Sequence, residues 1–157
     1  MISKVMIIGS GQMGSGIAQV FAQAGFTVYL NDIKEEFVQR GLNNITKQLE
    51  RSVEKGRMSA DEKGQVLANL LPSVSYEDAK QVQLVIEAAT ENREIKLNIF
   101  KQLDELTDPK TILASNTSSL SITDIAAATK HQGRVIGMHF FNPAAPKIGR
   151  ASCRERV

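Results

Sequence analysis

Short apolar runs alternate with longer amphipathic segments along this chain. Five runs of continuous apolar character are typical of strands buried in a parallel sheet: residues 5–8, 26–30, 84–88, 111–115 and 135–141. Between them, apolar residues recur at helical spacing over residues 17–24, 34–55, 59–70, 91–106 and 121–128. This alternation predicts an α/β fold, a doubly wound parallel sheet with helices on both faces.

A glycine-rich segment, GSGQMG at residues 9–14, joins the first strand to the first helix. Gly9 permits a tight turn, Gly11 lets the backbone approach a pyrophosphate, and Gly14 allows close packing of helix on strand. The free N–H groups and the positive dipole end of the helix favour phosphate. Such a segment alone is weak evidence, but the strand–turn–helix context predicts a Rossmann-type dinucleotide site.

Asp32 ends the second predicted strand, eighteen residues after Gly14. A carboxylate near this position accepts hydrogen bonds from the ribose hydroxyls of NAD and repels the 2′-phosphate of NADP. Its next neighbours are Ile33 and Lys34, so no arginine stands beside it to hold that phosphate. We therefore predict NAD as the cofactor, the alternative being a solvated turn aspartate.

The two helical segments that follow predict a hairpin inserted between strands, over about residues 34–70. The first segment is long and highly charged, and Gly56 interrupts the pattern after it. Residues 59–62, with a serine before an acidic first turn, then resemble the start of a second helix.

The composition fits one globular domain. The chain has 157 residues, of which 42% are hydrophobic and 23% charged. It has no apolar run of eighteen residues and no signal-peptide pattern before the first strand, so we expect no membrane span and a cytoplasmic location. The single cysteine, Cys153, excludes an internal disulfide, and no metal site is expected.

Residues 148–157 do not continue the pattern of the rest of the chain. They show no apolar period and can be encoded by a string that resembles a sequencing-adapter oligonucleotide. We expect an NAD-binding domain over residues 1–147 and a non-native tail over 148–157, the alternative being a genuine polar tail. Without the tail's three arginines and one glutamate the net charge falls from +2 to 0, which leaves no basic patch for nucleic acid.

His139 lies near the end of the last predicted strand. The carboxyl ends of strands form the edge where ligands bind in parallel sheets. An imidazole there can exchange a proton near neutral pH, although a histidine in an apolar strand is more often structural.

Four segments together resemble the 3-hydroxyacyl-CoA dehydrogenases, with the bacterial 3-hydroxybutyryl-CoA dehydrogenases as the nearest group. These are GSGQMGSGIA at residues 9–18, VIEA at 85–88, ASNTSSL at 114–120 and GMHFFNP at 137–143. The similarity covers essentially residues 1–145. It implies NAD-dependent oxidation of (S)-3-hydroxyacyl-CoA to 3-ketoacyl-CoA, or the reverse reduction, with the hairpin acting as a clamp over the acyl-CoA.

The resemblance also implies residue roles. His139 is similar to the family's catalytic base, and Ser118 to the serine that contacts both the substrate oxygen and the nicotinamide. Asp32 matches the ribose-binding acid, and three residues match positions that line the NAD site, with Asn116 close by: Glu91, Lys96 and Asn142.

The residues themselves leave other interpretations open. Ser118 and Asn116 can simply satisfy a turn, Glu91 can be a first-turn helix acid, and Lys96 a solvated helix cation. Lys47, Arg51 and Lys55 can face the phosphates of CoA or only solvent, and they are not assigned to the site.

The chain departs from the family after residue 147. A glutamate normally follows the catalytic histidine by twelve positions, and here that position is Ala151. The family's C-terminal helical domain, which closes the cleft and forms the usual homodimer interface, is missing. Because a base without its orienting acid loses much of its rate, we expect weak NAD binding and little turnover.

Three alternative functions remain: a non-catalytic NAD-binding module, a related hydroxyacid or gulonate-type dehydrogenase, and one domain of a multifunctional β-oxidation protein. Ser118 and His139 argue against most other Rossmann dehydrogenases, and Met1 directly before the first strand favours a stand-alone gene.

Overall fold

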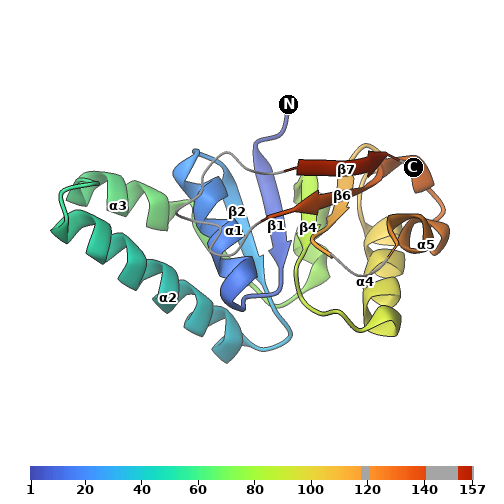
Figure 1. The fold of residues 1–157 in the computed structure, drawn as a ribbon, viewed down its shortest axis with the longest axis horizontal. Helices are drawn as coiled ribbons and strands as arrows, with labels where there is room; N and C mark the ends of the chain where they lie inside the picture. Colours follow the sequence, from blue (N-terminus) through green and yellow to red (C-terminus); the bar gives the residue numbers. More distant parts are fainter. Residues whose placement is uncertain (118–120, 141–151, 157) are drawn as a thin grey trace.

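A computed structural model describes residues 1–117 and 121–140 and the backbone of 152–156. Its centre is a seven-stranded sheet in the order β3-β2-β1-β4-β5-β6-β7, in which β1 to β6 run parallel (Figure 1). The strands are β1 (Lys4–Ile8), β2 (Thr27–Asn31), β3 (Leu70–Ser73), β4 (Leu84–Glu87), β5 (Ile112–Ser115), β6 (Val135–His139) and β7 (Ser152–Arg156). The predicted doubly wound parallel sheet is confirmed.

The helices connect these strands and cover both faces of the sheet (Figure 1). They are α1 (Gln12–Gln23), α2 (Glu35–Glu54), α3 (Ala60–Ala68), α4 (Arg93–Leu106) and α5 (Ile122–Ala127), with two 3₁₀ helices, η1 (Tyr76–Gln81) and η2 (Gln132–Arg134). Helices α2 and α3 form the predicted hairpin, which ends at Ala68 instead of about residue 70. The side chains of Ser59 and Asn92 cap α3 and α4 by accepting backbone N–H groups.

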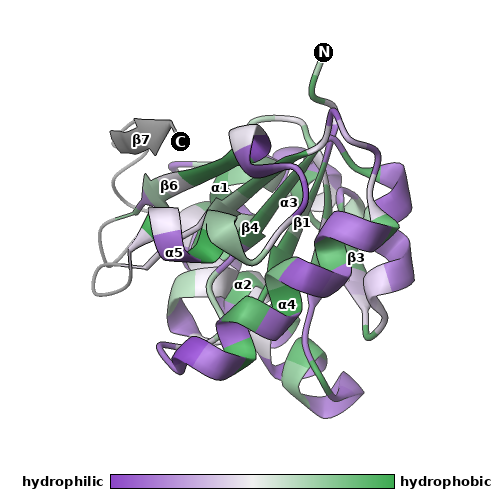
Figure 2. Cartoon of the chain, turned by 90° about the vertical axis from the view of Figure 1, so that its right-hand side faces the viewer, coloured by the Kyte–Doolittle hydropathy of each residue, from purple (hydrophilic) through white to green (hydrophobic). Residues whose placement is uncertain are grey.

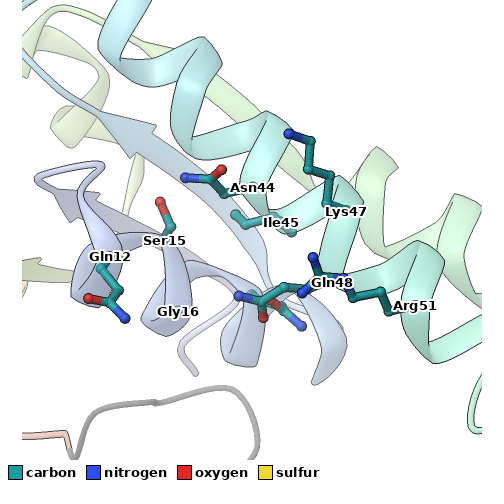
Figure 3. A pocket seen from close by; sticks show the side chains of 9 residues that line it. Gln12, Ser15, Gly16, Asn44, Ile45, Lys47, Gln48 and Arg51 are labelled. Carbon is teal, nitrogen blue, oxygen red and sulfur yellow. The ribbon is translucent and has the colours of Figure 1, made fainter.

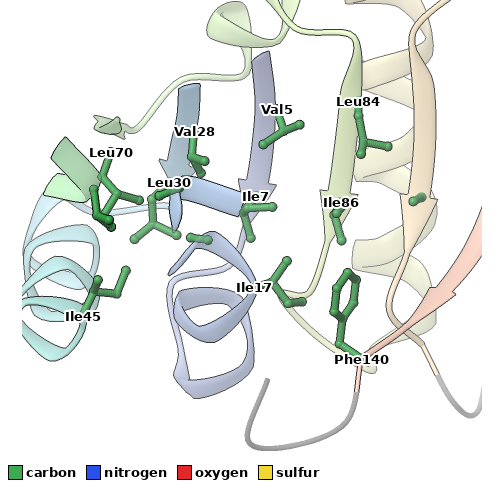
Figure 4. Close-up of a cluster of buried hydrophobic side chains, with 14 of the residues drawn as sticks. Val5, Ile7, Ile17, Val28, Leu30, Ile45, Leu70, Leu84, Ile86 and Phe140 are labelled. Atoms are coloured by element: carbon green, nitrogen blue, oxygen red, sulfur yellow. The ribbon is translucent and has the colours of Figure 1, made fainter. Parts of the chain in front are cut away.

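Two apolar clusters fill the space between the sheet and the helices. Val5 and Ile7 of β1 face the cluster beneath α1, α2 and α3, whereas Met6 and Ile8 face the cluster beneath α4 and α5 (Figure 4 shows the first cluster). Figure 2 shows apolar strands inside the molecule and polar residues on the outer surfaces of the helices. Successive side chains of a strand therefore point to opposite faces of the sheet, and each face is covered by helices. The molecule has three layers: helix, sheet and helix.

Strand β3 corrects the sequence-based prediction, which had continued the second hairpin helix to Leu70. Leu70 instead pairs in parallel with Val28, and the register runs on to Ser73 beside Asn31. Pro72 is tolerated because β3 lies at the edge of the sheet, where one side of the strand needs no N–H donor.

The other edge strand was also not predicted. The backbone of Ser152–Arg156 forms β7, antiparallel to β6, with an irregularity in the register between Gly137 and Met138. The sequence pattern had indicated neither helix nor strand there. The pairing of β7 with β6 does not test whether residues 148–157 are native, so the non-native tail stays a prediction.

The sheet positions a binding edge at one end of the molecule. Strand β1 has β2 on one side and β4 on the other, so the winding direction reverses at β1. Ligands of open α/β sheets bind at the carboxyl ends of the strands beside such a reversal. Within the described residues no helix is both long and apolar enough to cross a membrane, and no cluster of three or more His, Cys, Asp or Glu side chains is placed to hold a metal ion.

Candidate functional site

The glycine loop lies at the carboxyl end of β1, directly before α1. Gly9 has a φ of 102°, the left-handed region that favours glycine, and a Cβ atom there would lie 2.7 Å from the carbonyl oxygen of Ala88. A Cβ atom at Gly14 would overlap the carbonyl oxygen of Gly9, so helix and loop pack as closely as predicted. Apart from Gly11 itself and its chain neighbours, no atom of the described residues lies within 4 Å of a Cβ position at Gly11, which leaves space for a pyrophosphate to approach the start of α1.

Asp32 follows β2 and faces this loop. Its Oδ2 atom accepts hydrogen bonds from the backbone N–H of Ser10 at 2.9 Å and from the Ser10 hydroxyl at 2.7 Å. Its Oδ1 atom accepts the N–H of Ile33 at 2.8 Å. The carboxylate is therefore held beside the phosphate loop, where an adenosine ribose would lie.

A hollow of about 430 Å³ opens at the same edge of the sheet and collects four predicted site residues: Glu91, Lys96, Asn116 and His139. These residues come from three segments separated in sequence, and His139 is the last residue of β6. Met13, Thr90 and Phe140 also line the hollow. Ser118 and Asn142, the other two predicted residues, lie outside the described residues.

Asn116 has a structural role that the sequence did not reveal. Its side-chain Oδ1 atom accepts the backbone N–H of Phe140 at 2.9 Å, and its backbone N–H donates to the carbonyl oxygen of Glu87 at 2.9 Å. It thus joins the ends of β4, β5 and β6 beside His139. Thr117, which was not among the predicted site residues, donates from its hydroxyl to Glu91 at 3.0 Å.

Lys96 is buried, so the interpretation as a solvated helix cation is wrong. Only 1% of Lys96 is exposed, and its Nζ atom lies 2.8 Å from Oε1 of Glu87 at the end of β4. The neighbouring Ile95, an apolar residue of the same helix, is 52% exposed. Glu87 was not among the predicted site residues, although a glutamate within an apolar strand is itself a signal that a buried partner is needed.

A second hollow of about 390 Å³ lies between α1 and α2 (Figure 3). Lys47, Gln48 and Arg51 line it from α2, and Gln12, Ser15 and Gln19 line it from α1. Gln19 is 4% exposed, and its side-chain oxygen has no hydrogen-bond partner in the described part of the chain. Two of the cations left unassigned by the sequence therefore border a polar hollow next to the phosphate-loop helix.

Comparison with known proteins identifies this arrangement. Residues 4–147 match the family model described as 3-hydroxyacyl-CoA dehydrogenase, NAD binding domain. The chain belongs to this family. The match confirms the family resemblance and NAD as the cofactor of the domain.

Several similar proteins are named 3-hydroxybutyryl-CoA dehydrogenase. A 3-hydroxybutyryl-CoA dehydrogenase of Clostridioides difficile is 47% identical over 140 residues, which cover 89% of this chain and 50% of the relative. The crystal structure of (S)-3-hydroxybutyryl-CoA dehydrogenase from Ralstonia eutropha has a TM-score of 0.90 at 45% identity, covering 92% of this chain and 51% of that one. The Escherichia coli K12 3-hydroxybutyryl-CoA dehydrogenase structure also has a TM-score of 0.90, at 44% identity and with 92% and 30% coverage. The chain spans about half the length of the curated relatives it matches.

Proposed function

We propose that this chain is the NAD-binding part of an enzyme that interconverts (S)-3-hydroxyacyl-CoA and 3-ketoacyl-CoA, with 3-hydroxybutyryl-CoA as the substrate. The observation that carries the proposal is the convergence of Glu91, Lys96, Asn116 and His139 on one hollow beside the glycine loop. The names of the similar dehydrogenases support the acyl-CoA substrate class.

The residues present fit NAD. Gly11 leaves the start of α1 open to the pyrophosphate, and Asp32 faces the same loop with a carboxylate that can accept the ribose hydroxyls. The hollow at His139 then receives the nicotinamide half, with Glu91 and Lys96 on its wall. NAD, when bound, supplies the acceptor for the hydride.

His139 acts as the base in this proposal. As the hydride leaves C3 of the substrate, the imidazole takes the proton of the 3-hydroxyl group, and the carbon–oxygen bond becomes a carbonyl. In the reverse direction the imidazolium returns the proton to the 3-keto oxygen. The hydrogen bond from Phe140 to Asn116 stabilises the backbone next to His139. From the family resemblance, Ser118 is proposed to contact the substrate oxygen, and Asn142 is proposed to line the NAD site.

The hairpin is proposed to take the CoA part of the substrate. The hollow between α1 and α2 is bordered by Lys47 and Arg51, two cations on a helix face that suits the phosphates of CoA. A cytoplasmic location, and a homodimer formed through a C-terminal helical domain, stay predictions from the sequence.

A non-catalytic NAD-binding module is the second candidate, because Ala151 stands where the family has its orienting glutamate. A fusion experiment separates the two functions. Residues 1–147 are joined to the half of the Clostridioides difficile relative that this chain does not cover. The family resemblance implies that this half supplies the glutamate and the second domain. We expect this fusion to oxidise NADH in the presence of acetoacetyl-CoA, whereas the 157-residue chain binds NADH but turns over little.

The matched controls are His139→Asn and His131→Asn in the fusion. His139→Asn should remove turnover by at least about a hundredfold, the size of a general acid–base contribution. His131 lies before η2 and is 49% exposed on its side chain, so His131→Asn should leave turnover unchanged. A folded fusion that binds NADH but is inactive supports the module, and robust turnover by the 157-residue chain contradicts the expected need for the glutamate.

A further inference from the structure

Glu87 is a charged residue at the centre of the sheet that the proposed chemistry does not use. It is the last residue of β4 and is 0% exposed, so it can contact no ligand directly. Its Oε1 atom lies 2.8 Å from Nζ of Lys96 and accepts the hydroxyl of Ser115 at 2.9 Å. Burying two opposite charges is tolerated only when they are paired and their remaining hydrogen-bonding capacity is satisfied.

The second carboxylate oxygen of Glu87 holds the loop that follows β4. Oε2 accepts the backbone N–H of Ala89 at 2.8 Å and that of Thr90 at 3.3 Å. The same loop packs against Gly9 on its other side, where a Cβ atom would lie 2.7 Å from Ala88 and Ala89. Glu87 thus holds the loop against the glycine loop at the rim of the His139 hollow.

Lys96 of α4 is held by side chains from the ends of β4 and β5. Its ammonium group has three N–H donors. One is directed at Glu87, and another lies 3.4 Å from the Ser115 hydroxyl. Lys96 also lines the hollow, so its side chain forms part of the wall where the nicotinamide–ribose half is proposed to bind.

We infer that Glu87 is a positioning residue for the nicotinamide–ribose half of the dinucleotide, acting through Lys96 and through the loop at Ala89 and Thr90. This inference rests on the proposed NAD site. Glu87 keeps the Lys96 charge paired and oriented. It also fixes the position of the loop at Ala89 and Thr90 at the rim of the hollow. The adenine half is held by Asp32 and the glycine loop, whereas the side-chain bonds of Glu87 go to Lys96, Ser115 and the loop at Ala89 and Thr90, so the adenine half should depend least on Glu87.

The test measures the dissociation constants of three ligands, NADH, ADP-ribose and ADP. They are compared between the unaltered 157-residue chain and its Glu87→Gln variant. The glutamine keeps the size of the side chain but removes its charge. We expect NADH and ADP-ribose to weaken at least about tenfold and ADP to change less than about twofold. Lys96→Met should show the same selectivity. Glu50→Gln is the control, because Glu50 forms an exposed ion pair with Lys63, and it should change none of the three.

Either single substitution leaves one buried charge unpaired, which can unfold the chain. The double variant Glu87→Gln with Lys96→Met is therefore measured as well, and thermal unfolding checks that each variant is folded. Because the two residues act as one unit, the double variant should lose no more affinity for ADP-ribose than either single variant. An equal loss for all three ligands, or no loss for ADP-ribose, in a folded variant would overturn the inference. If the unaltered chain binds none of the ligands, the proposed NAD site itself has failed.

Discussion

Two glycines in helix interiors allow a direct test of the contact between the hairpin and the glycine loop. Gly41 lies in α2 and Gly64 in α3, and alanine at either position gains about 0.5–1 kcal/mol of helix propensity. At Gly64 no atom of the described residues outside the adjacent helix backbone lies within 4 Å of the new Cβ. At Gly41 the Cβ would lie 2.8 Å from the carbonyl oxygen of Ser10 and 2.8 Å from Oγ of Ser15, well inside ordinary contact.

The same substitution should therefore have opposite effects at the two positions. Overpacking costs about 1–3 kcal/mol, so Gly41→Ala should lower the free energy of unfolding by about 1–2 kcal/mol. Gly64→Ala should raise it by about 0.5–1 kcal/mol. The difference of about 2 kcal/mol corresponds to roughly 4–8 °C in Tm for a domain of this size.

Urea and thermal unfolding of the two variants measure this difference, and an NADH titration adds the functional result. Ser10 also donates two hydrogen bonds to Asp32, so a displaced Ser10 should weaken NADH binding in Gly41→Ala and not in Gly64→Ala. Equal stabilisation by both substitutions, with unchanged NADH affinity, would refute the close approach of α2 to the loop.

Two further predictions concern Asp32 and the buried pair of Arg134 and Asp104. Asp32→Asn should weaken NADH binding about tenfold, because hydrogen bonds to charged groups contribute about 1.5–3 kcal/mol. It should also reduce the preference for NADH over NADPH, and an unchanged ratio of the two dissociation constants would contradict this. Burial alone would raise the pKa of Asp104, but hydrogen bonds from Arg134, the Lys130 N–H and His131, together with the Arg134 charge, lower it below its usual value. A depressed carboxyl pKa contributes stability above its unfolded value of about 4, and this stability is lost as pH falls through the folded value. Asp104→Asn should therefore destabilise the chain by about 3–5 kcal/mol at pH 7 and by clearly less near pH 3, as measured by urea unfolding; an equal loss at both pH values would be the contrary result.

The glycine loop and the strands on either side of α1 were predictable because they depend on neighbours in sequence. The turn at Gly9, the helix after it and the acid at Asp32 are set within one strand–helix–strand unit. The apolar runs of β4, β5 and β6 were recognisable for a similar reason, since a strand covered on both faces is apolar throughout.

Strand β3 and the burial of Lys96 were decided by tertiary contacts. Leu70–Ser73 is only four residues long and contains a proline, so its extended form follows from pairing with β2 and not from local preference. Lys96 resembles any exposed cation of a charged helix in the sequence, but α4 is rotated so that Lys96 reaches Glu87 and Ile95 faces solvent.

The sequence by itself determined the kind of domain, its cofactor loop and the histidine at the binding edge, because these follow from period, turn chemistry and strand order. Only the tertiary structure decided which side chains meet there. Asn116 accepts the N–H of Phe140, and Glu87 binds Lys96, across strands that the sheet brings side by side. Pairs between residues so distant in sequence have no local pattern, since their geometry exists only after the sheet has formed.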